Sequence, residues 1–295
     1  MSPRFAVVAP VAAGVTADPV WMTQFARHLE SCGFESIVAV EHTVLLTEYS
    51  SVYPYDASGR VDIPADCAVP DPLELLTFLA GQTTTLGLAT GVLVLPNHHP
   101  VVLAKRVATL NALSGGRIRL AVGMGWLREE IEACGAPFDD RGRRADEQID
   151  VLRLLWSDQP DGASHSGEFF QFAHAACYPK PVSPIPIHIG GHRRAAARRA
   201  GRRGDGLQPL GVAGAELLGL IALMRESAER AGRDPDALEL SLGHLVPKVD
   251  ADRAGRLAEL GADRIVLAMP PVTDIDEAKD MLSACADRLG LAPCP

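Results

Sequence analysis

The sequence has no apolar run that reaches the ~18 residues needed for a membrane-spanning helix. Its first residues also lack the basic stretch and apolar segment of a secretory signal. We therefore expect a cytoplasmic protein with no membrane partner. An excess of basic residues is missing too, because the formal net charge is −9 at pH 7. Binding to nucleic acid relies on a basic surface, so we expect no nucleic-acid partner.

Paired cysteines and several common catalytic motifs are absent as well. The six cysteines are scattered and form no CxxC pair, which argues against a zinc site or a disulfide framework. The sequence contains no Walker A, GxSxG or HExxH motif. Lysine is scarce, with four among the 28 basic residues. Such an arginine-rich composition usually reflects a GC-rich genome, so clustered arginines alone are weak evidence of function.

The sequence does contain a regular alternation of β-branched runs with helical periods. Strands that alternate with helices form parallel sheets, and eight such units in 295 residues fit a closed (β/α)8 TIM barrel, an α/β fold. We expect residues 1–295 to form one such domain. The strands are predicted at residues 5–9, 36–40, 86–95, 118–122, 185–189, 206–210, 238–242 and 265–268. The helices are predicted at residues 18–32, 72–82, 100–113, 126–156 with a break near 135–137, 192–203, 215–232, 251–260 and 274–289.

Two segments are longer than connections in such a fold require, and they predict insertions after strands two and four. Residues 43–70 follow the second strand and contain three tyrosines, Tyr49, Tyr53 and Tyr55. Loops of this length are usually lids or binding loops. Residues 158–184 precede the fifth strand and are predicted to form a short hairpin followed by a proline-rich approach.

The stretch "RIRLAVGMGWLREE" ends an apolar strand in Gly123 and Gly125. A Rossmann fingerprint needs a third glycine three residues after the second, and Arg128 stands there, so the dinucleotide interpretation fails. A barrel strand that ends in Gly-x-Gly at the catalytic face fits better. Glycines at that place let a flat ligand approach the backbone closely.

Three blocks of sequence, in this order, resemble the luciferase-like monooxygenase superfamily, and together they cover most of residues 5–210. The first is "VAVEH" at residues 38–42, and the second is "TGVLVLPNHHPVVLAKRVATLNALSGGRIRLAVGMGWLREE". The third is "PKPVSPIPIHIGGHRRAAARRAGRRGDGL". Members of the superfamily are flavin- or deazaflavin-dependent (β/α)8 barrels, and the pattern most resembles the branch that uses coenzyme F420.

The resemblance places the cofactor phosphate at Gly190 and Gly191, ahead of a helix that begins near His192. Small residues free the backbone N–H groups of a helix N-terminus, which form an anion site. Arg193 and Arg194 lie in the first turn, where they could meet the acidic tail of the cofactor.

Glu41 and His42 end the second predicted strand, where barrel enzymes place functional groups. In related F420 enzymes the histidine of this motif lies beside the deazaflavin and the substrate, so the resemblance makes His42 the candidate for proton transfer. Glu41 is expected to orient His42. A structural histidine is the alternative for this position.

The resemblance also implies how the cofactor ring is bound. Related F420 enzymes have a bulge with a non-proline cis peptide behind the ring, which we assign to Gly91–Val92 and the preceding Thr90. Gly123, Met124, Gly125 and Trp126 are expected to supply further contacts with the ring. Trp126 stands where F420-dependent sugar-phosphate dehydrogenases carry a glutamate, which puts that substrate in doubt.

The leading hypothesis is an F420-dependent oxidoreductase that transfers a hydride between the deazaflavin and a small organic substrate, in a homodimer. An FMN-dependent luciferase-like monooxygenase is the first alternative. The others are a non-catalytic flavin-binding protein and a metal-dependent barrel hydrolase with His42, His188 and His192 as ligands. No metal is expected, since the first strand offers no metal ligand of the kind such hydrolases carry.

Overall fold

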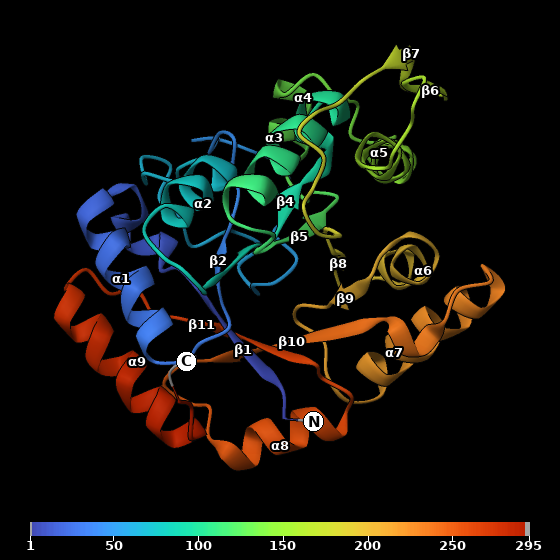
Figure 1. The fold of residues 1–295 in the computed structure, drawn as a ribbon. Coiled ribbons are helices and arrows are strands. Elements are labelled where there is room, and N and C mark those ends of the chain that lie inside the picture. Colours follow the sequence, from blue (N-terminus) through green and yellow to red (C-terminus); the bar gives the residue numbers. More distant parts are fainter. Residues whose placement is uncertain (1, 293–295) are drawn as a thin grey trace.

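The computed structural model describes residues 2–292 and shows a closed parallel barrel with helices on its outside (Figure 1). The strands pair in the order β3-β2-β1-β11-β10-β9-β8-β5-β4, and β3 also pairs with β5, which closes the sheet. Because β3 and β4 are two halves of one barrel strand, the barrel has eight strands. The strands are β1 (Arg4–Val8), β2 (Ser36–Ala39), β3 (Gly87–Thr90), β4 (Leu93–Val94), β5 (Ile118–Gly123), β8 (Ile187–Gly190), β9 (Gly206–Gln208), β10 (Glu239–Leu245) and β11 (Arg264–Ala268).

The helices follow the strands as the sequence predicts, and the long predicted helix at 126–156 is two helices with a break at the expected place. The α-helices are α1 (Pro19–Ser31), α2 (Pro72–Ala80), α3 (Pro100–Leu113), α4 (Arg128–Ala133), α5 (Arg141–Trp156), α6 (Arg194–Arg203), α7 (Gly214–Arg230), α8 (Ala251–Glu259) and α9 (Ile275–Leu289). None of the helices within residues 2–292 is long and apolar enough to cross a membrane.

Aspartate caps define where several of these helices begin. The Asp18 carboxylate accepts hydrogen bonds from the N–H groups of Val20 and Trp21 at the start of α1. Asp71 and Asp274 cap α2 and α9 in the same way. A side-chain oxygen at this position satisfies backbone donors that have no partner within the helix. These three helices begin within one residue of their predicted starts.

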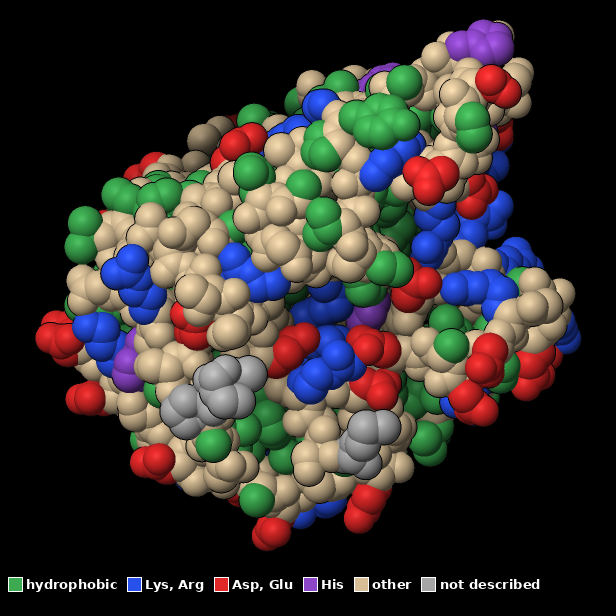
Figure 2. Space-filling view, viewed as in Figure 1, with side chains coloured by type: hydrophobic (Ala, Val, Ile, Leu, Met, Phe, Trp, Pro, Cys, Tyr) green, Lys and Arg blue, Asp and Glu red, His purple; other side chains and the backbone are tan. Residues whose placement is uncertain are grey.

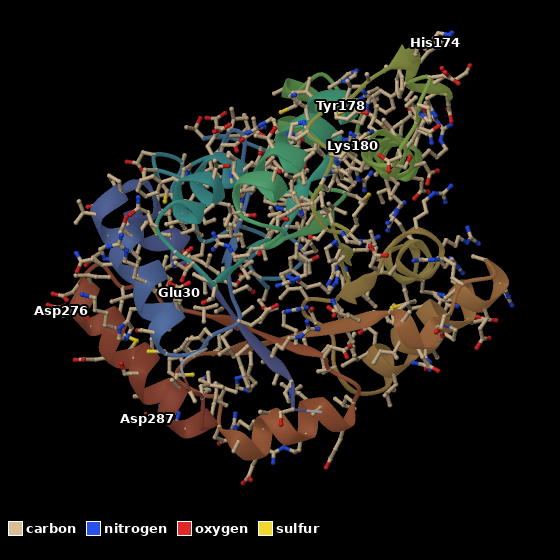
Figure 3. The ribbon with its side chains drawn as sticks, in the orientation of Figure 1. Glu30, His174, Tyr178, Lys180, Asp276 and Asp287 are labelled. Carbon is tan, nitrogen blue, oxygen red and sulfur yellow. The ribbon has the colours of Figure 1, made fainter. Side chains whose placement is uncertain are left out.

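Both predicted insertions are present. Residues 43–70 contain no helix or strand, and they lie between β2 and α2. The second insertion carries an antiparallel hairpin of β6 (Ala163–Ser166) and β7 (Gln171–Ala175). His174 lies on this hairpin at the edge of the molecule, remote from the barrel strands (Figure 3). Only the first insertion therefore brings side chains to the mouth of the barrel.

The barrel interior changes from charged to small residues along its axis. Side chains in a strand alternate between the interior and the helices. At the start of the strands, Arg264 is 2% exposed and binds Glu35 at 2.8 Å and Glu239 at 2.9 Å. Figure 2 shows acidic and basic side chains together at the centre of this face. A layer of Ala6, Val38, Ala89 and Val266 follows. Towards the strand ends, Gly91, Gly123 and Gly190 pack against Val38 and Val92.

Candidate functional site

The mouth of the barrel is built around a bulge between β3 and β4. The peptide bond between Gly91 and Val92 is cis, as the resemblance implies. A Cβ added at Gly123 would lie 2.6 Å from Val92 Cγ2, and one at Gly190 would lie 2.5 Å from Val92 Cγ1. The Val92 side chain therefore fills the space between these two strand ends. A Cβ at Gly91 would lie 2.3 Å from Val38 Cγ1, so glycine is required at all three places.

An aromatic wall stands beside this mouth. The Trp126 ring meets the rings of Tyr53 at 5.0 Å and Tyr49 at 5.6 Å, both edge to face. Tyr53 in turn contacts Tyr55, which contacts His192 at 5.1 Å between ring centroids. Such T-shaped pairs are the favoured arrangement of aromatic rings. Tyr53 and Tyr55 of the long insertion thus connect Trp126 to His192 in a continuous row of rings.

Gly125 gives Trp126 its place in this wall. Its φ of +75° is a left-handed conformation that favours glycine, and a Cβ there would lie 2.7 Å from Ile131 Cδ1 and 2.9 Å from Val94 Cγ1. Met124, the residue before it, is half-buried against the barrel core. The Gly-x-Gly turn is therefore a close-packed barrel rim, as the sequence predicts.

His42 is held by an acid that the sequence did not single out. Its Nδ1 lies 3.1 Å from Glu130 Oε2, and the two side chains are 10% and 3% exposed. Glu130 Oε1 also accepts a 2.6 Å hydrogen bond from the Thr43 N–H. The His42 ring lies edge to face with Trp126, with 6.4 Å between the centroids. His42 is thereby a nearly buried histidine at the mouth, with one ring nitrogen engaged.

Glu41 does not orient His42, and that expectation is wrong. Its Oε1 lies 2.6 Å from His98 Nε2, and its Oε2 accepts a hydrogen bond from the Val94 N–H. Both residues lie beyond the end of β2 at Ala39, and their side chains take different partners, His98 for Glu41 and Glu130 for His42. Through the Val94 N–H, Glu41 holds β4, the strand segment that follows the Val92 bulge. Its assignment as a catalytic residue has no support in this geometry.

The neighbouring acid, Glu129, holds the middle of the long insertion. Its Oε1 accepts hydrogen bonds from the N–H groups of Ser50 at 2.6 Å and Ser51 at 3.2 Å, while Oε2 accepts from Ser51 Oγ at 2.6 Å. The Ser51 hydroxyl is the main cause that lowers the pKa of Glu129 to about 2. Glu129 and Glu130 of α4 thus anchor the same loop at two points.

The turn after β8 has the features of an anion site. Gly190 still belongs to the strand, where it pairs with Gln208, so the phosphate turn begins one residue later than predicted. Gly191 has a φ of +125°, which favours glycine. The next helix, α6, begins at Arg194, and among residues 2–292 no side chain caps its N-terminus. Its first N–H groups are free to bind an anion.

Several buried polar atoms near this turn have no hydrogen-bond partner within the described part of the chain. They include His192 Nδ1 and Gln208 Oε1. Burial is the main cause that lowers the pKa of His192, and the positive charge of Arg193 acts in the same direction. Buried polar atoms are nearly always hydrogen-bonded in proteins, so unpaired ones at a strand end indicate a ligand.

Thr90 is placed differently from the other predicted ring contacts. Its side chain is fully buried, and its hydroxyl donates a 2.7 Å hydrogen bond to the Ala121 carbonyl of β5. The alternation along β3 directs Ala89 and Gly91 to the barrel interior and Thr90 away from it. Thr90 therefore ties two strands together just below the bulge, and its side chain does not face the mouth.

A bound F420 or FMN fits these residues. Val92 and the glycines packed around it form a surface without long side chains on which a flat ring could lie, and the uncapped α6 suits a phosphate. The unpaired atoms of His192 and Gln208 lack partners that a ligand would supply. The metal-hydrolase alternative is different. Among residues 2–292, no three His, Cys, Asp or Glu side chains gather into a metal-ion site. The three histidines of that alternative, His42, His188 and His192, are therefore not brought together.

Sequence reasoning missed three residues of this site, namely Glu130, Glu129 and His98. Glu130 lies on α4 and 88 positions from His42, so no local spacing connects the two residues. The one available signal was an acidic pair in the first turn of a helix that follows a barrel strand. Such a pair also occurs wherever acids stabilise a helix N-terminus, so the signal is weak.

The comparisons with known proteins agree with this architecture. The sequence profile of the luciferase-like monooxygenase family matches residues 4–286, so the chain belongs to that family. An uncharacterized protein of Mycobacterium tuberculosis is 31% identical over 279 residues, which cover 91% of this chain and 93% of the relative. An F420-dependent glucose-6-phosphate dehydrogenase of Segniliparus rotundus is 28% identical over 229 residues, or 75% of this chain and 63% of that enzyme.

A solved structure with this fold is an F420-dependent secondary alcohol dehydrogenase in complex with an F420-acetone adduct. It superposes with a TM-score of 0.77 over 98% of this chain and 99% of that chain, at 18% sequence identity. This likeness shows the shared (β/α)8 fold of the luciferase-like family. The family match and the sequence relatives support an oxidoreductase in general terms.

Proposed function

We propose that this protein binds coenzyme F420 at the barrel mouth and transfers a hydride between the deazaflavin and a small organic substrate. The observation that carries the proposal is the close-packed surface that Val92 forms with Gly91, Gly123 and Gly190, together with the nearly buried His42 that follows β2. A flat ring system needs a floor from which no long side chain projects, and hydride transfer to or from a carbon–oxygen or carbon–carbon bond needs a proton donor or acceptor nearby.

The residues divide the work by position. Gly91, Gly123 and Gly190 let Val92 pack into a compact floor that supports the ring, and the N-terminus of α6 binds the phosphate through backbone N–H groups. When bound, the cofactor supplies a carbon centre that accepts or releases a hydride. His42 exchanges a proton with the substrate, and the aromatic wall around Trp126 covers the substrate and excludes water.

The charge at α6 favours the F420 cofactor over FMN. Arg193 and Arg194 are exposed, and within the described residues neither forms an ion pair. F420 carries an acidic tail beyond its phosphate and FMN does not, so free guanidinium groups would attract F420 more strongly. This local attraction opposes the repulsion from a net charge of −9. The attraction is exposed and therefore weakens as salt increases.

Fluorescence titration with each cofactor, at low and at moderate salt, tests the proposal. We expect tighter binding of F420 than of FMN, with an F420 affinity that falls with salt. Tighter binding of FMN, and an F420 affinity that does not depend on salt, would favour an FMN-dependent monooxygenase, the activity for which the family is named. A panel of alcohols and unsaturated acceptors with the bound cofactor then identifies the substrate. The expected homodimer stays a prediction, which sedimentation velocity measures.

A further inference from the structure

We propose that Glu130 is a positioning residue that holds His42 in a single tautomer. In this tautomer Nδ1 carries the hydrogen, and Nε2 is the atom that exchanges a proton with the substrate. The use of that proton rests on the proposed function, whereas the contact between the two residues does not.

The hydrogen bonds of Glu130 define the direction of the contact with His42. Its Oε1 lies 2.6 Å from the Thr43 nitrogen and 3.4 Å from the Val44 nitrogen, and backbone N–H groups donate only. Its Oε2 lies 3.1 Å from His42 Nδ1. An ionised carboxylate accepts hydrogen bonds and donates none, so Nδ1 must be the donor. The neutral imidazole then has its lone pair on Nε2.

Burial strengthens the hydrogen bond that selects this tautomer. The Glu130 residue is 2% exposed, and the His42 side chain is 10% exposed, so water competes little for either group. A lost hydrogen bond at a buried charged group costs more than one at the surface. Glu41, the other acid close to His42 in sequence, is engaged with His98 and Val94. Glu130 is thus the acid that meets His42.

The two oxygens of Glu130 have separate partners, which gives a sharp test by an isosteric substitution. In Glu130→Gln the amide oxygen is expected to take the place of Oε1, because the Thr43 and Val44 N–H groups both require an acceptor. The amide NH2 then faces His42 Nδ1 as a donor. Nδ1 must accept, and the hydrogen moves to Nε2. The substitution should invert the tautomer and leave the packing unchanged.

The experiment uses the cofactor-free protein with 15N-labelled histidine, and long-range 1H–15N correlation spectra identify the protonated nitrogen of the neutral ring. A His42→Gln variant assigns the His42 signals. We expect the Nδ1–H tautomer in the wild type and the Nε2–H tautomer in Glu130→Gln. The matched control is Glu129→Gln, an adjacent acid whose partners are Ser50 and Ser51, and it should keep the wild-type tautomer. A wild-type Nε2–H tautomer would overturn the proposal.

Turnover adds a second readout once a substrate is known. Glu130→Gln should lower kcat by about 10²–10⁴-fold, the range for lost acid–base catalysis, with little change in cofactor affinity. An inverted tautomer with wild-type turnover would overturn the positioning role. The failure of the proposed function is distinguishable, because wild-type protein that binds no F420 would overturn that function while the expected tautomer pattern still supports the Glu130 contact.

Discussion

Val92 and Gly190 meet in the barrel mouth, where the Cγ1 of Val92 lies 2.5 Å from the position that a Cβ on residue 190 would take. Two residues almost a hundred positions apart therefore share one volume. Real Cβ atoms do not approach other atoms so closely, so each residue limits what the other can be. Gly190 of β8 and the bulge between β3 and β4 are therefore complementary in shape.

Gly190→Ala should therefore destabilise the protein by about 1–3 kcal/mol, the usual cost of an added methyl group in a filled interior. The substitution should also displace Val92 and weaken cofactor binding. Chemical denaturation and cofactor titration measure the two effects. Gly243→Ala is the control for stability, because a Cβ at this strand position would meet no atom within 4 Å. An equal loss of stability in both variants would show that Val92 is not the cause.

A smaller residue at position 92 should relieve this conflict. In a Val92→Ala background the Cγ atoms are gone, and the nearest remaining side-chain atom, the Val92 Cβ, lies 3.7 Å from the added methyl carbon. Gly190→Ala should then cost less than it does in the wild type, with a coupling free energy of about 0.5–3 kcal/mol between the sites. A double-mutant cycle by denaturation measures that coupling. Strict additivity of the two substitutions would contradict the shared volume.

His42→Ala should reduce kcat by about 10²–10⁴-fold while cofactor affinity changes little, because the histidine serves proton transfer and not ligand binding. Steady-state kinetics with the identified substrate and a fluorescence titration measure the two quantities. Turnover at the wild-type rate would show that His42 is a structural residue, the alternative that the sequence leaves open.

Glu129 should make the anchoring of the long insertion sensitive to acid. Its pKa is lowered from the ordinary 4.5 to about 2, chiefly by the Ser51 hydroxyl, so the folded state favours the ionised form. This stabilisation is present in full above about pH 4.5 and is lost as the pH falls towards 2. Wild type should therefore resist proteolysis within residues 43–70 better than Glu129→Gln at pH 7. The difference between the two proteins should shrink progressively below pH 4.5, and a constant difference would contradict the assignment.

Arg264 should contribute strongly to stability at the N-terminal end of the barrel strands. It is 2% exposed and pairs with both Glu35 and Glu239, so Arg264→Ala removes a buried guanidinium that bridges two partly buried carboxylates. Removing one member of a buried ion pair typically costs about 3–5 kcal/mol. The control is Arg230→Ala, which breaks an exposed pair with Glu226 on α7 and should cost about 0.5 kcal/mol or less. Urea denaturation distinguishes these values.

The barrel and its glycine rim could be predicted from the sequence, because both depend on local patterns. Strand and helix periods are local, and a glycine run at the end of an apolar strand is visible in a few residues. The boundaries were less accurate, since β10 extends to Leu245 and the predicted strand at 86–95 is divided by the bulge. The starts of α1 and α2 agreed with the predicted ranges to within one residue for the same local reason.

The partner of His42 could not be predicted, because it depends on the closure of the whole barrel. Glu130 reaches His42 from a helix two barrel strands further along the chain. Adjacency in sequence favoured Glu41, yet the chain beyond β2 directs Glu41 to His98 and His42 to Glu130. Contacts of this kind require the three-dimensional fold, and a single sequence carries no measure of them.

The way α4 holds the long insertion has a consequence for how this enzyme class diversifies. Glu129 and Glu130 grip the insertion mainly through the backbone N–H groups of Thr43, Ser50 and Ser51. A main-chain N–H is the same for every residue except proline. These anchors do not involve the side chain of Tyr53, which faces Trp126, so that side chain can change without loss of the anchors. New substrate ranges can therefore arise when such side chains of the insertion are exchanged, because the attachment of the insertion to α4 does not depend on those side chains.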